Sequence, residues 1–406
     1  MLATGELAAP MRAAGRRTSV RRRARGGVAA LLVCASLIPF SAAWTAPGAS
    51  GVARGKTSDP LVLAYYYIWH SPSTWERAKT DYPLLGRYAS SDPVVVAEHL
   101  REARDAGIDG FIVSWKHEPR LDAPLAVLVG EARRQDFKLV LLYEGLDFAR
   151  NALDGARIAT DLQWFADTYA DDAVFDTFGK TAVVWSGTWK FSVDEITAVR
   201  AAVGAPHRML LLGSERSAKD YQAKAAVLDG NAYYWSSADP QETPGYDRRL
   251  GELSDSVIAD GGLWIAPAAP GFDARLVGGT SIVPRRGGET YRSSWLGALR
   301  SYPSAIGIIS WNEFSENSQI EPSQSFADEY LRITAALTGQ AVSPASELPA
   351  GSPPGAAQSS AGPVDPALDS SELPGPRFDG PLSSVVAIVL LVAFGVIVRV
   401  VRRRPA

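Results

Sequence analysis

The feature that most constrains the fold of this chain is a regular alternation of apolar runs and helix-like stretches between residues 60 and 339. The runs are rich in β-branched and aromatic residues, which is typical of buried parallel strands. They cover residues 61–69, 110–115, 138–143, 181–185, 209–212, 231–235, 263–266 and 305–311. Eight strand–helix units in about 280 residues predict an α/β protein with a single (β/α)8 barrel, which usually takes about 250 residues. We place this barrel domain at residues 58–339.

A doubly wound open sheet is the alternative architecture for such an alternation. No G-x-G-x-x-G motif follows the first run, so the dinucleotide-binding form of that fold has no support. Local signals also predict where the first and the last helix begin and end. Asp92 is expected to cap the first helix and Gly107 to follow it, whereas the last helix is expected to open with a capping box from Ser325 to Asp328 and to end at Gly339.

Residues 1–50 have the pattern of a secretory signal peptide or an N-terminal membrane segment. Arginines precede the apolar stretch 28–40, and small residues follow it at 41–43, as they do at a signal cleavage site. The only cysteine of the chain, Cys34, lies in this apolar stretch. A chain cleaved after the segment would therefore have neither disulfides nor a thiol nucleophile.

A second apolar segment lies near the C-terminus. Residues 382–398 carry no charge and are followed by arginines, which predicts a transmembrane helix at 381–399 and a basic cytoplasmic tail at 400–406. Residues 340–380 are rich in Pro, Ser, Ala and Gly, and we expect a disordered linker there. The positive-inside rule then places the barrel outside the cytoplasm, held at the cell membrane by one C-terminal span, whether or not the signal is cleaved.

The charge of the chain argues against nucleic acid as a partner. Its 41 basic and 44 acidic residues give a net charge of −3, but many arginines lie in the two terminal segments. The barrel region is therefore distinctly acidic and has no basic stripe to follow a phosphate backbone. No Walker loop is present either, and we expect no cofactor.

Aromatic and polar side chains gather where the apolar runs end. In a (β/α)8 barrel, functional side chains stand at the carboxyl ends of the strands. Aromatic rings offer flat faces to the C–H face of a sugar, and carboxylates and amides bind its hydroxyls. We therefore expect a carbohydrate-binding site formed by Tyr66, Tyr67, Trp69, Trp115, His117, Glu144, Tyr233, Tyr234, Trp235, Asp273 and Asn312.

Glu313 and Glu316 follow the last run in the stretch S-W-N-E-F-S-E-N-S-Q-I-E-P at residues 310–322. One carboxyl of such a pair can protonate a leaving oxygen while the other serves as a base or nucleophile. An exposed acidic loop is the ordinary explanation of an isolated E-x-x-E motif. The aromatic residues at the other strand ends favour catalysis, and we expect Glu313 and Glu316 to be the catalytic pair.

Other chemistries have weaker support in the sequence. His70 and His117 end neighbouring runs with Glu144 nearby, which leaves a metal site as an alternative. No H-x-H or H-E-x-x-H spacing is present, so we expect no metal, and hydrogen bonding is the more ordinary role for both histidines. The G-x-S-x-G motif of serine hydrolases is absent as well.

Several short patches are similar to one known family. They are Y-Y-Y-I-W at 65–69, A-G-I-D-G-F-I-V-S-W at 106–115, Y-E at 143–144, D-G-N-A-Y-Y at 229–234 and P-G-F-D at 270–273. The most specific patch, W-N-E-F-S-E-N-S-Q-I-E-P at 311–322, is similar to the family pattern N-E-W-H-E-G-T-Q-I-E-P. Over nearly all of residues 61–338 the chain resembles glycoside hydrolase family 99, the endo-α-1,2-mannosidase and mannanase family, and its family 71 relatives.

The resemblance implies a metal-free retaining hydrolase that acts on α-mannosidic or related α-glycosidic bonds, with an α-mannan or another α-glycan as its partner. It implies that Glu316 is the general acid. Glu313 would deprotonate the 2-hydroxyl of the substrate, which attacks the anomeric carbon to give a 1,2-anhydro sugar. Glu144 would hold sugar hydroxyls.

The chain departs from the family pattern at several positions. Phe314 and Ser315 replace Trp and His between the two glutamates, and Asn317-Ser318 replaces Gly-Thr. Gly145-Leu146 follows Glu144 where the family has Pro-Tyr. These changes motivate an alternative function, a non-catalytic glycan-binding surface protein that keeps the barrel.

Overall fold

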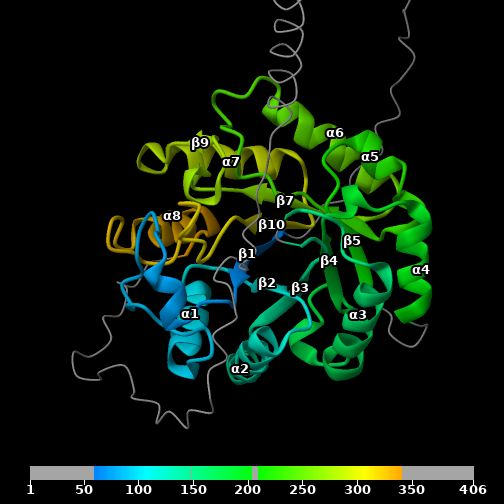
Figure 1. Ribbon diagram of the computed structural model, residues 1–406. Helices are drawn as coiled ribbons and strands as arrows, with labels where there is room; N and C mark the ends of the chain where they lie inside the picture. The colour runs from blue at the N-terminus through cyan, green and yellow to red at the C-terminus, as the bar shows by residue number, and fades with distance from the viewer. Residues whose placement is uncertain (1–58, 148, 204–208, 341–406) are drawn as a thin grey trace, which may run out of the picture. The chain divides into compact units, whose positions relative to one another are not determined.

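The computed structural model describes residues 59–340 except 148 and 204–208. Eight parallel strands form a closed barrel in the order β1-β10-β7-β6-β5-β4-β3-β2 (Figure 1). They are β1 Leu61–Tyr67, β2 Gly110–Trp115, β3 Lys138–Glu144, β4 Ala182–Ser186, β5 Leu210–Gly213, β6 Gly230–Ala232, β7 Leu263–Ala268 and β10 Ala305–Ile308. Pairing of β1 with β10 closes the sheet, so the predicted (β/α)8 barrel is confirmed and the open sheet is excluded.

The helices lie outside the strands (Figure 1). They are α1 Pro93–Asp105, α2 Pro119–Gln135, α3 Gly155–Tyr169, α4 Val193–Val203, α5 Ala218–Gln222, α6 Tyr246–Ala259, α7 Glu289–Arg300 and α8 Glu329–Thr338. A short antiparallel hairpin, β8 Phe272–Asp273 with β9 Ile282–Val283, stands in the connection from β7 to α7. This hairpin adds to the eight predicted strand–helix units.

Successive residues of each strand face two different cores. In β1, Leu63 and Tyr65 pack inside the barrel, whereas Val62, Ala64 and Tyr66 pack between the barrel and the helices. Both layers exclude solvent, so the strands are apolar on both faces and show no polar alternation. The side of the barrel that a residue faces therefore follows from its position in the strand.

The predicted N-terminal caps of the first and the last helix have different outcomes. The Asp92 side chain accepts a 2.9 Å hydrogen bond from the Val94 amide and caps α1, as predicted. The capping box at Ser325 is wrong, because α8 begins at Glu329 and the side chain of Asp328 makes no capping bond. Ser325 instead donates its hydroxyl proton to Asp81, at 2.9 Å.

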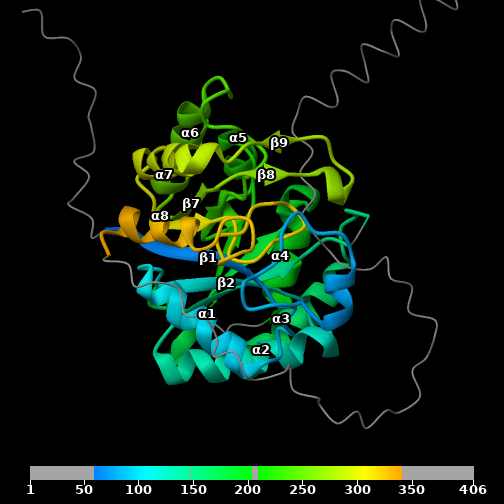
Figure 2. The ribbon, with the colours of Figure 1, turned by 90° about the vertical axis from the view of Figure 1, so that its left-hand side faces the viewer.

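The connection from β1 to α1 is bonded to the loop that follows β10. The Thr80 amide and hydroxyl both donate to the carbonyl of Phe314, at 3.0 and 2.7 Å. Further along, the Leu84 amide donates to the carbonyl of Pro322. Figure 2 shows the β1–α1 connection and the β8–β9 hairpin on the same side of the barrel. Together these segments surround the loop that carries the predicted acidic pair.

Within residues 59–340, with 148 and 204–208 left aside, no helix has the length and apolar character needed to cross a bilayer. The segments predicted at 1–50, 381–399 and 400–406 lie outside the described residues, as does the 340–380 linker apart from its first residue.

Candidate active site

Glu313 and Glu316 stand in the loop after β10, with both side chains buried. The Glu313 amide donates to the Ser310 hydroxyl, and the Glu313 carboxylate accepts a 2.8 Å bond from the Ser315 amide. The β8–β9 hairpin supports the second glutamate, because the Asp273 amide donates to the Glu316 carbonyl at 2.7 Å. Both carboxyls are thus held on backbone that is fixed from two directions.

Asn312 fastens this loop to the end of β1. Its Oδ1 accepts from the Tyr67 amide at 2.8 Å, and its Nδ2 donates to the Tyr67 carbonyl at 2.9 Å. Nδ2 also lies 3.3 Å from the Tyr88 hydroxyl. The side-chain amide of Asn312 thereby extends the hydrogen bonding between β1 and the chain that follows β10 beyond the last paired residues of the two strands.

The two carboxyls differ in their surroundings. Burial raises the pKa of Glu313, while the Ser315 amide and the Lys79 ammonium act in the opposite direction. Burial raises the pKa of Glu316 well above its usual value, and the charges of Glu313 and Glu144 add to this effect. Neither carboxyl oxygen of Glu316 has a hydrogen-bond partner within the described residues. At neutral pH the arrangement favours a proton on Glu316 over one on Glu313.

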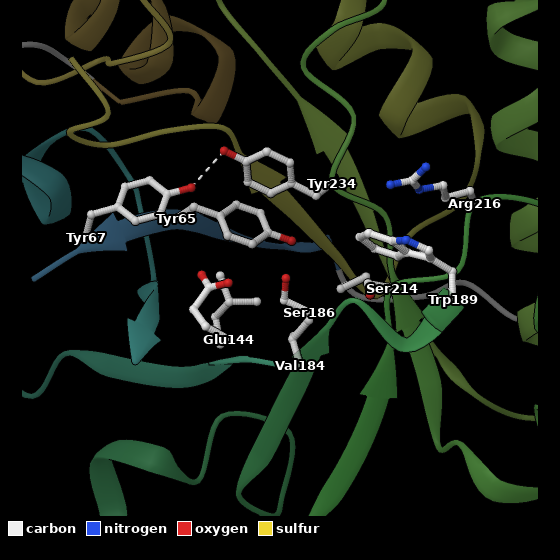
Figure 3. Close-up of a pocket in the computed structure, with 11 residues that line it drawn as sticks. Tyr65, Tyr67, Glu144, Val184, Ser186, Trp189, Ser214, Arg216 and Tyr234 are labelled. Atoms are coloured by element: carbon white, nitrogen blue, oxygen red, sulfur yellow. Dashed lines mark hydrogen bonds between the residues drawn. The ribbon is translucent and has the colours of Figure 1, made fainter. Parts of the chain in front are cut away.

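A cavity opens at the carboxyl ends of the strands, with about 420 Å³ of empty space that includes its opening to solvent (Figure 3). Tyr67 and Tyr234 line it and join their hydroxyls at 2.7 Å. Neither glutamate lines the cavity, but the Tyr67 amide is bonded to the side chain of Asn312, the residue before Glu313. Burial raises the pKa of Tyr67, and the charges of Glu316 and Glu313 add to this effect. The full lining is Tyr65, Tyr67, Leu142, Glu144, Val184, Ser186, Trp189, Ser214, Arg216, Ala232 and Tyr234.

Three of the predicted binding residues, Tyr67, Tyr234 and Glu144, line the cavity. Glu144 accepts a 2.7 Å bond from the Ser114 hydroxyl, and burial raises its pKa. Trp69 packs against Tyr67 with the two rings tilted by 32° and their centroids 4.3 Å apart.

The other predicted binding residues have protein partners. Asp273 pairs with Arg275 at 2.6 Å, which lowers the pKa of Asp273. The side chains of Tyr66, Trp115, Tyr233 and Trp235 belong to the layer between the barrel and the helices. His117 stacks on Trp164 of α3, at 4.3 Å between centroids. Since these outer side chains pack against helices, the structure does not bring them to the cavity.

The structure also separates the histidines of the metal alternative. His70 is buried, stacks on Trp75 at 4.4 Å and lies 3.1 Å from the Asn312 carbonyl through Nε2. His117 Nδ1 lies 3.0 Å from Asp122 in α2. Among the residues with described positions, no group of three or more His, Cys, Asp or Glu side chains is placed to hold a metal ion.

The positions that depart from the family pattern have structural roles in this chain. Phe314 packs edge to face against Trp75, with centroids 5.6 Å apart. The Arg285 guanidinium bonds both the side chain and the carbonyl of Asn317, each at 3.1 Å. A Cβ added to Gly145 would stand 2.2 Å from the indole nitrogen of Trp185, so the close approach of these two strand ends favours glycine there.

The residues of this region that sequence reasoning missed include Tyr65, Lys79, Arg150, Trp189 and Arg216. All except Tyr65 lie outside the strands, in connections with no recognisable motif. Tyr65 was detectable in principle, because it lies two residues from Tyr67 and therefore faces the same side of β1.

A family model described as glycosyl hydrolase family 99 matches residues 70–333 of the chain. The human glycoprotein endo-alpha-1,2-mannosidase-like protein is 24% identical over 298 residues, which cover 65% of this chain and 62% of the human protein. Mouse glycoprotein endo-alpha-1,2-mannosidase is 22% identical over 296 residues, covering 65% and 61%. The chain thus spans about six tenths of the length of these curated relatives.

Solved structures show the same fold. The endo-alpha-mannosidase of Bacteroides thetaiotaomicron, in complex with bis-tris-propane, superposes with a TM-score of 0.59 and 24% identity. The match covers 70% of this chain and 98% of the bacterial one. A second structure, described as a glycoside hydrolase-like protein, gives a TM-score of 0.56 at 17% identity, covering 70% and 95% of the two chains.

Proposed function

Since the chain belongs to glycosyl hydrolase family 99 and is a glycoside hydrolase, we propose that it cleaves α-mannosidic or related α-glycosidic bonds with retention of configuration. The curated relatives that it matches are named endo-alpha-1,2-mannosidases, which supports a mannoside as the substrate. The proposed site comprises Glu313 and Glu316 as the catalytic pair, with Tyr67, Tyr234 and Glu144 on the sugar.

The proposed reaction has two steps. In the first, the Glu313 carboxylate takes the proton of the substrate 2-hydroxyl, and the 2-oxygen attacks the anomeric carbon. Glu316 gives its proton to the departing glycosidic oxygen, and a 1,2-anhydro sugar forms. In the second step, water attacks the anomeric carbon from the other face as Glu316 takes its proton. Glu313 then returns a proton to the 2-oxygen, so two inversions give net retention.

One observation carries this assignment: the two carboxyls have different environments. An acid must hold a proton at neutral pH, and burial without a hydrogen-bond partner favours the neutral form of Glu316. A base must be ionised, and the Ser315 amide and Lys79 favour the carboxylate of Glu313. Two nearby carboxyls with separated pKa values are the arrangement that acid–base catalysis requires.

The test uses the full-length protein with α-mannans and α-glucans, and follows released sugars by mass spectrometry. Glu313→Gln and Glu316→Gln should each abolish release while the folded barrel is kept. An aryl glycoside with a good leaving group separates the roles, because it needs little protonation. Glu316→Gln should recover part of its activity on that substrate and Glu313→Gln should not. Full activity of either variant on mannan would refute the assignment.

The departures from the family pattern leave both glutamates in place, and one of the new residues bonds Glu313. Phe314 is buried against Trp75, and Ser315 supports the Glu313 carboxylate through its amide. The glycan-binding alternative predicts that glycan binding survives both glutamine substitutions and that no glycan is ever cleaved. The mannan experiment therefore distinguishes the two functions.

We further propose that the protein is anchored in the cell membrane by residues 381–399, with the barrel outside the cytoplasm. The support is the apolar segment with arginines on its C-terminal side and the signal-like segment at residues 1–50. Protease added to intact cells should release the barrel by cutting the 340–380 linker. A barrel that resists protease until the cells are lysed would contradict this topology.

A further inference from the structure

The cavity carries a cation at the end away from Glu144. Arg216 follows β5 and lines the cavity with Trp189, while Glu144 and the Tyr67–Tyr234 pair line the other end (Figure 3). The Arg216 guanidinium lies over the Trp189 indole, 3.9 Å from the ring centroid. Among residues 59–340, the masked positions aside, no carboxylate forms an ion pair with Arg216, although most arginines of the barrel have such a partner.

The acidic group that acts on Arg216, Glu215, is itself paired with a lysine. The nearest acidic side chain in sequence, Glu215, is buried and pairs with Lys224 at 2.9 Å. Arg150 lies over the same indole, 5.7 Å from its centroid. Arg249 donates to the Arg216 carbonyl at 2.9 Å and brings a third guanidinium to the region. Burial and the charge of Arg150 lower the pKa of Arg216, while Tyr233 and Glu215 act in the opposite direction, so a bound anion would favour the charged guanidinium.

The stacking geometry keeps the guanidinium able to bind. A ring under the face of a guanidinium leaves its edge, with the N–H donors, unused. That edge matches the paired oxygens of a carboxylate or of a phosphate or sulfate ester, which accept two parallel hydrogen bonds. The Ser186 and Ser214 side chains line the cavity between Arg216 and Glu144, and the Ser214 hydroxyl is bonded within the protein, donating to the Trp185 carbonyl at 2.9 Å.

We propose that the Trp189–Arg216 end of the cavity is a subsite for an anionic substituent of the glycan, a carboxylate or a phosphate or sulfate ester, bound by the edge of the Arg216 guanidinium. This inference rests on the proposed function for the identity of the ligand as a glycan. It deepens that function by assigning the substrate class: a negatively charged α-glycan is preferred over its neutral counterpart. Arg150 strengthens the field at the subsite.

The alternative for Arg216 is hydrogen bonding to neutral sugar hydroxyls. A hydroxyl offers one acceptor atom without charge, so this role gives no preference for an anion. The preference itself is therefore the property to measure. Raising the ionic strength should weaken it if it is electrostatic, and should leave a neutral contact unchanged.

The experiment compares one α-manno-oligosaccharide in three forms: neutral, phosphorylated at C6, and oxidised at C6 to a uronate, each carrying the change on the first or the last sugar. Dissociation constants are measured by calorimetry on full-length Glu316→Gln protein, and kcat/KM on the wild type. We expect one anionic form to bind about 10- to 100-fold more tightly than the neutral form, the range of a charge-assisted hydrogen-bonded pair. The two anionic arms decide between phosphate and carboxylate.

Arg216→Gln should abolish the preference, and Arg216→Lys should restore part of it, because lysine keeps the charge and loses the planar fork. Arg248→Gln is the matched control, since Arg248 is exposed on α6 and pairs with Glu252. The control should keep the full preference. If Arg216→Gln fails to fold, as judged by its thermal unfolding, Arg216→Lys decides the question.

The outcomes separate this inference from the proposed function. Cleavage of the neutral form with no preference for either anion, or a preference that Arg216→Gln leaves intact, overturns the inference while the glycosidase stands. Absence of cleavage with tight, Arg216-dependent binding of one anionic form supports the subsite and counts against the proposed function.

Discussion

The Asn312 side chain joins β1 to the loop after β10, which carries the proposed catalytic pair and is called the catalytic loop below. Removal of this side chain should lower both stability and activity. Asn312→Ala deletes the 2.8 and 2.9 Å bonds to the Tyr67 amide and carbonyl, together with the 3.3 Å contact to Tyr88. Leaving two buried backbone groups without partners costs about 1–3 kcal/mol each. Water entering the vacated space offsets part of this, so we expect a loss of about 2–5 kcal/mol in the free energy of unfolding.

The assay is urea unfolding combined with thermal denaturation and mannan hydrolysis. At about 2–4 °C per kcal/mol for a domain near this size, the melting temperature should fall by roughly 5–15 °C. The kcat should fall as well, because Asn312 precedes Glu313 and fixes its backbone. Asn312→Asp keeps the acceptor but turns a carboxylate oxygen toward the Tyr67 carbonyl, so it should be destabilising too.

Asn231 provides a matched control on the other side of the barrel. It holds Glu215 in the same way, accepting from its amide at 2.7 Å and donating to its carbonyl at 3.1 Å. Asn231→Ala should therefore lose a similar amount of stability with a smaller loss of kcat, since the catalytic loop is not attached to it. A change below about 1 kcal/mol for Asn312→Ala would refute the assigned cost of the unsatisfied groups.

Three further predictions follow from the site. The pKa of Glu316 is raised in the folded protein, so the folded state holds the proton of this carboxyl more tightly than the unfolded state does. The resulting contribution to stability is complete below the ordinary pKa of 4.5 and is lost as the pH rises through the raised pKa. Glu316→Gln should thus melt higher than the wild type at pH 8, and this advantage should disappear below pH ~4.5, as calorimetry at several pH values can show. Lys79→Gln removes a cation that lowers the pKa of Glu313, so the acid limb of the kcat/KM profile should move to higher pH; an unmoved limb would contradict the pairing. Tyr67→Phe deletes the 2.7 Å hydroxyl contact with Tyr234 and should cost about 1–2 kcal/mol in urea unfolding, whereas an unchanged stability would show that the contact contributes nothing.

The fold could be predicted from the sequence because each strand carries its own signal. The run at 110–115 coincides with β2, and five of the other runs fall within about two residues of a strand at each end, whereas the run at 305–311 extends three residues past β10. The expected run at 231–235 is the second exception, since β6 ends at Ala232 and the aromatic residues beyond it lie outside the strand pairing. The β8–β9 hairpin went unrecognised because strands of two residues carry no periodicity.

The site could be predicted only in part. Glu313 and Glu316 were identified because two carboxyls follow a strand end directly, where barrel geometry concentrates chemistry. The side of the barrel that each aromatic residue faces could not be predicted from the sequence. Since β1 is buried on both faces, no polar alternation distinguishes Tyr66 from Tyr65 and Tyr67. Lys79 and Arg216 reach the site from connections whose paths depend on long-range contacts.

Closure of the barrel by β1 and β10 also determines when the proposed active site is completed during synthesis of the chain. Tyr67 and Asn312 are bonded although 245 positions separate them in the sequence. A ribosome therefore completes the cavity residues of β1, β3, β4 and β6 before it makes Glu313 or Glu316, the proposed catalytic pair. A nascent chain can form most of the cavity, yet it lacks the proposed acid and base until its last strand docks. On the proposed assignment, hydrolysis is confined to fully synthesised molecules.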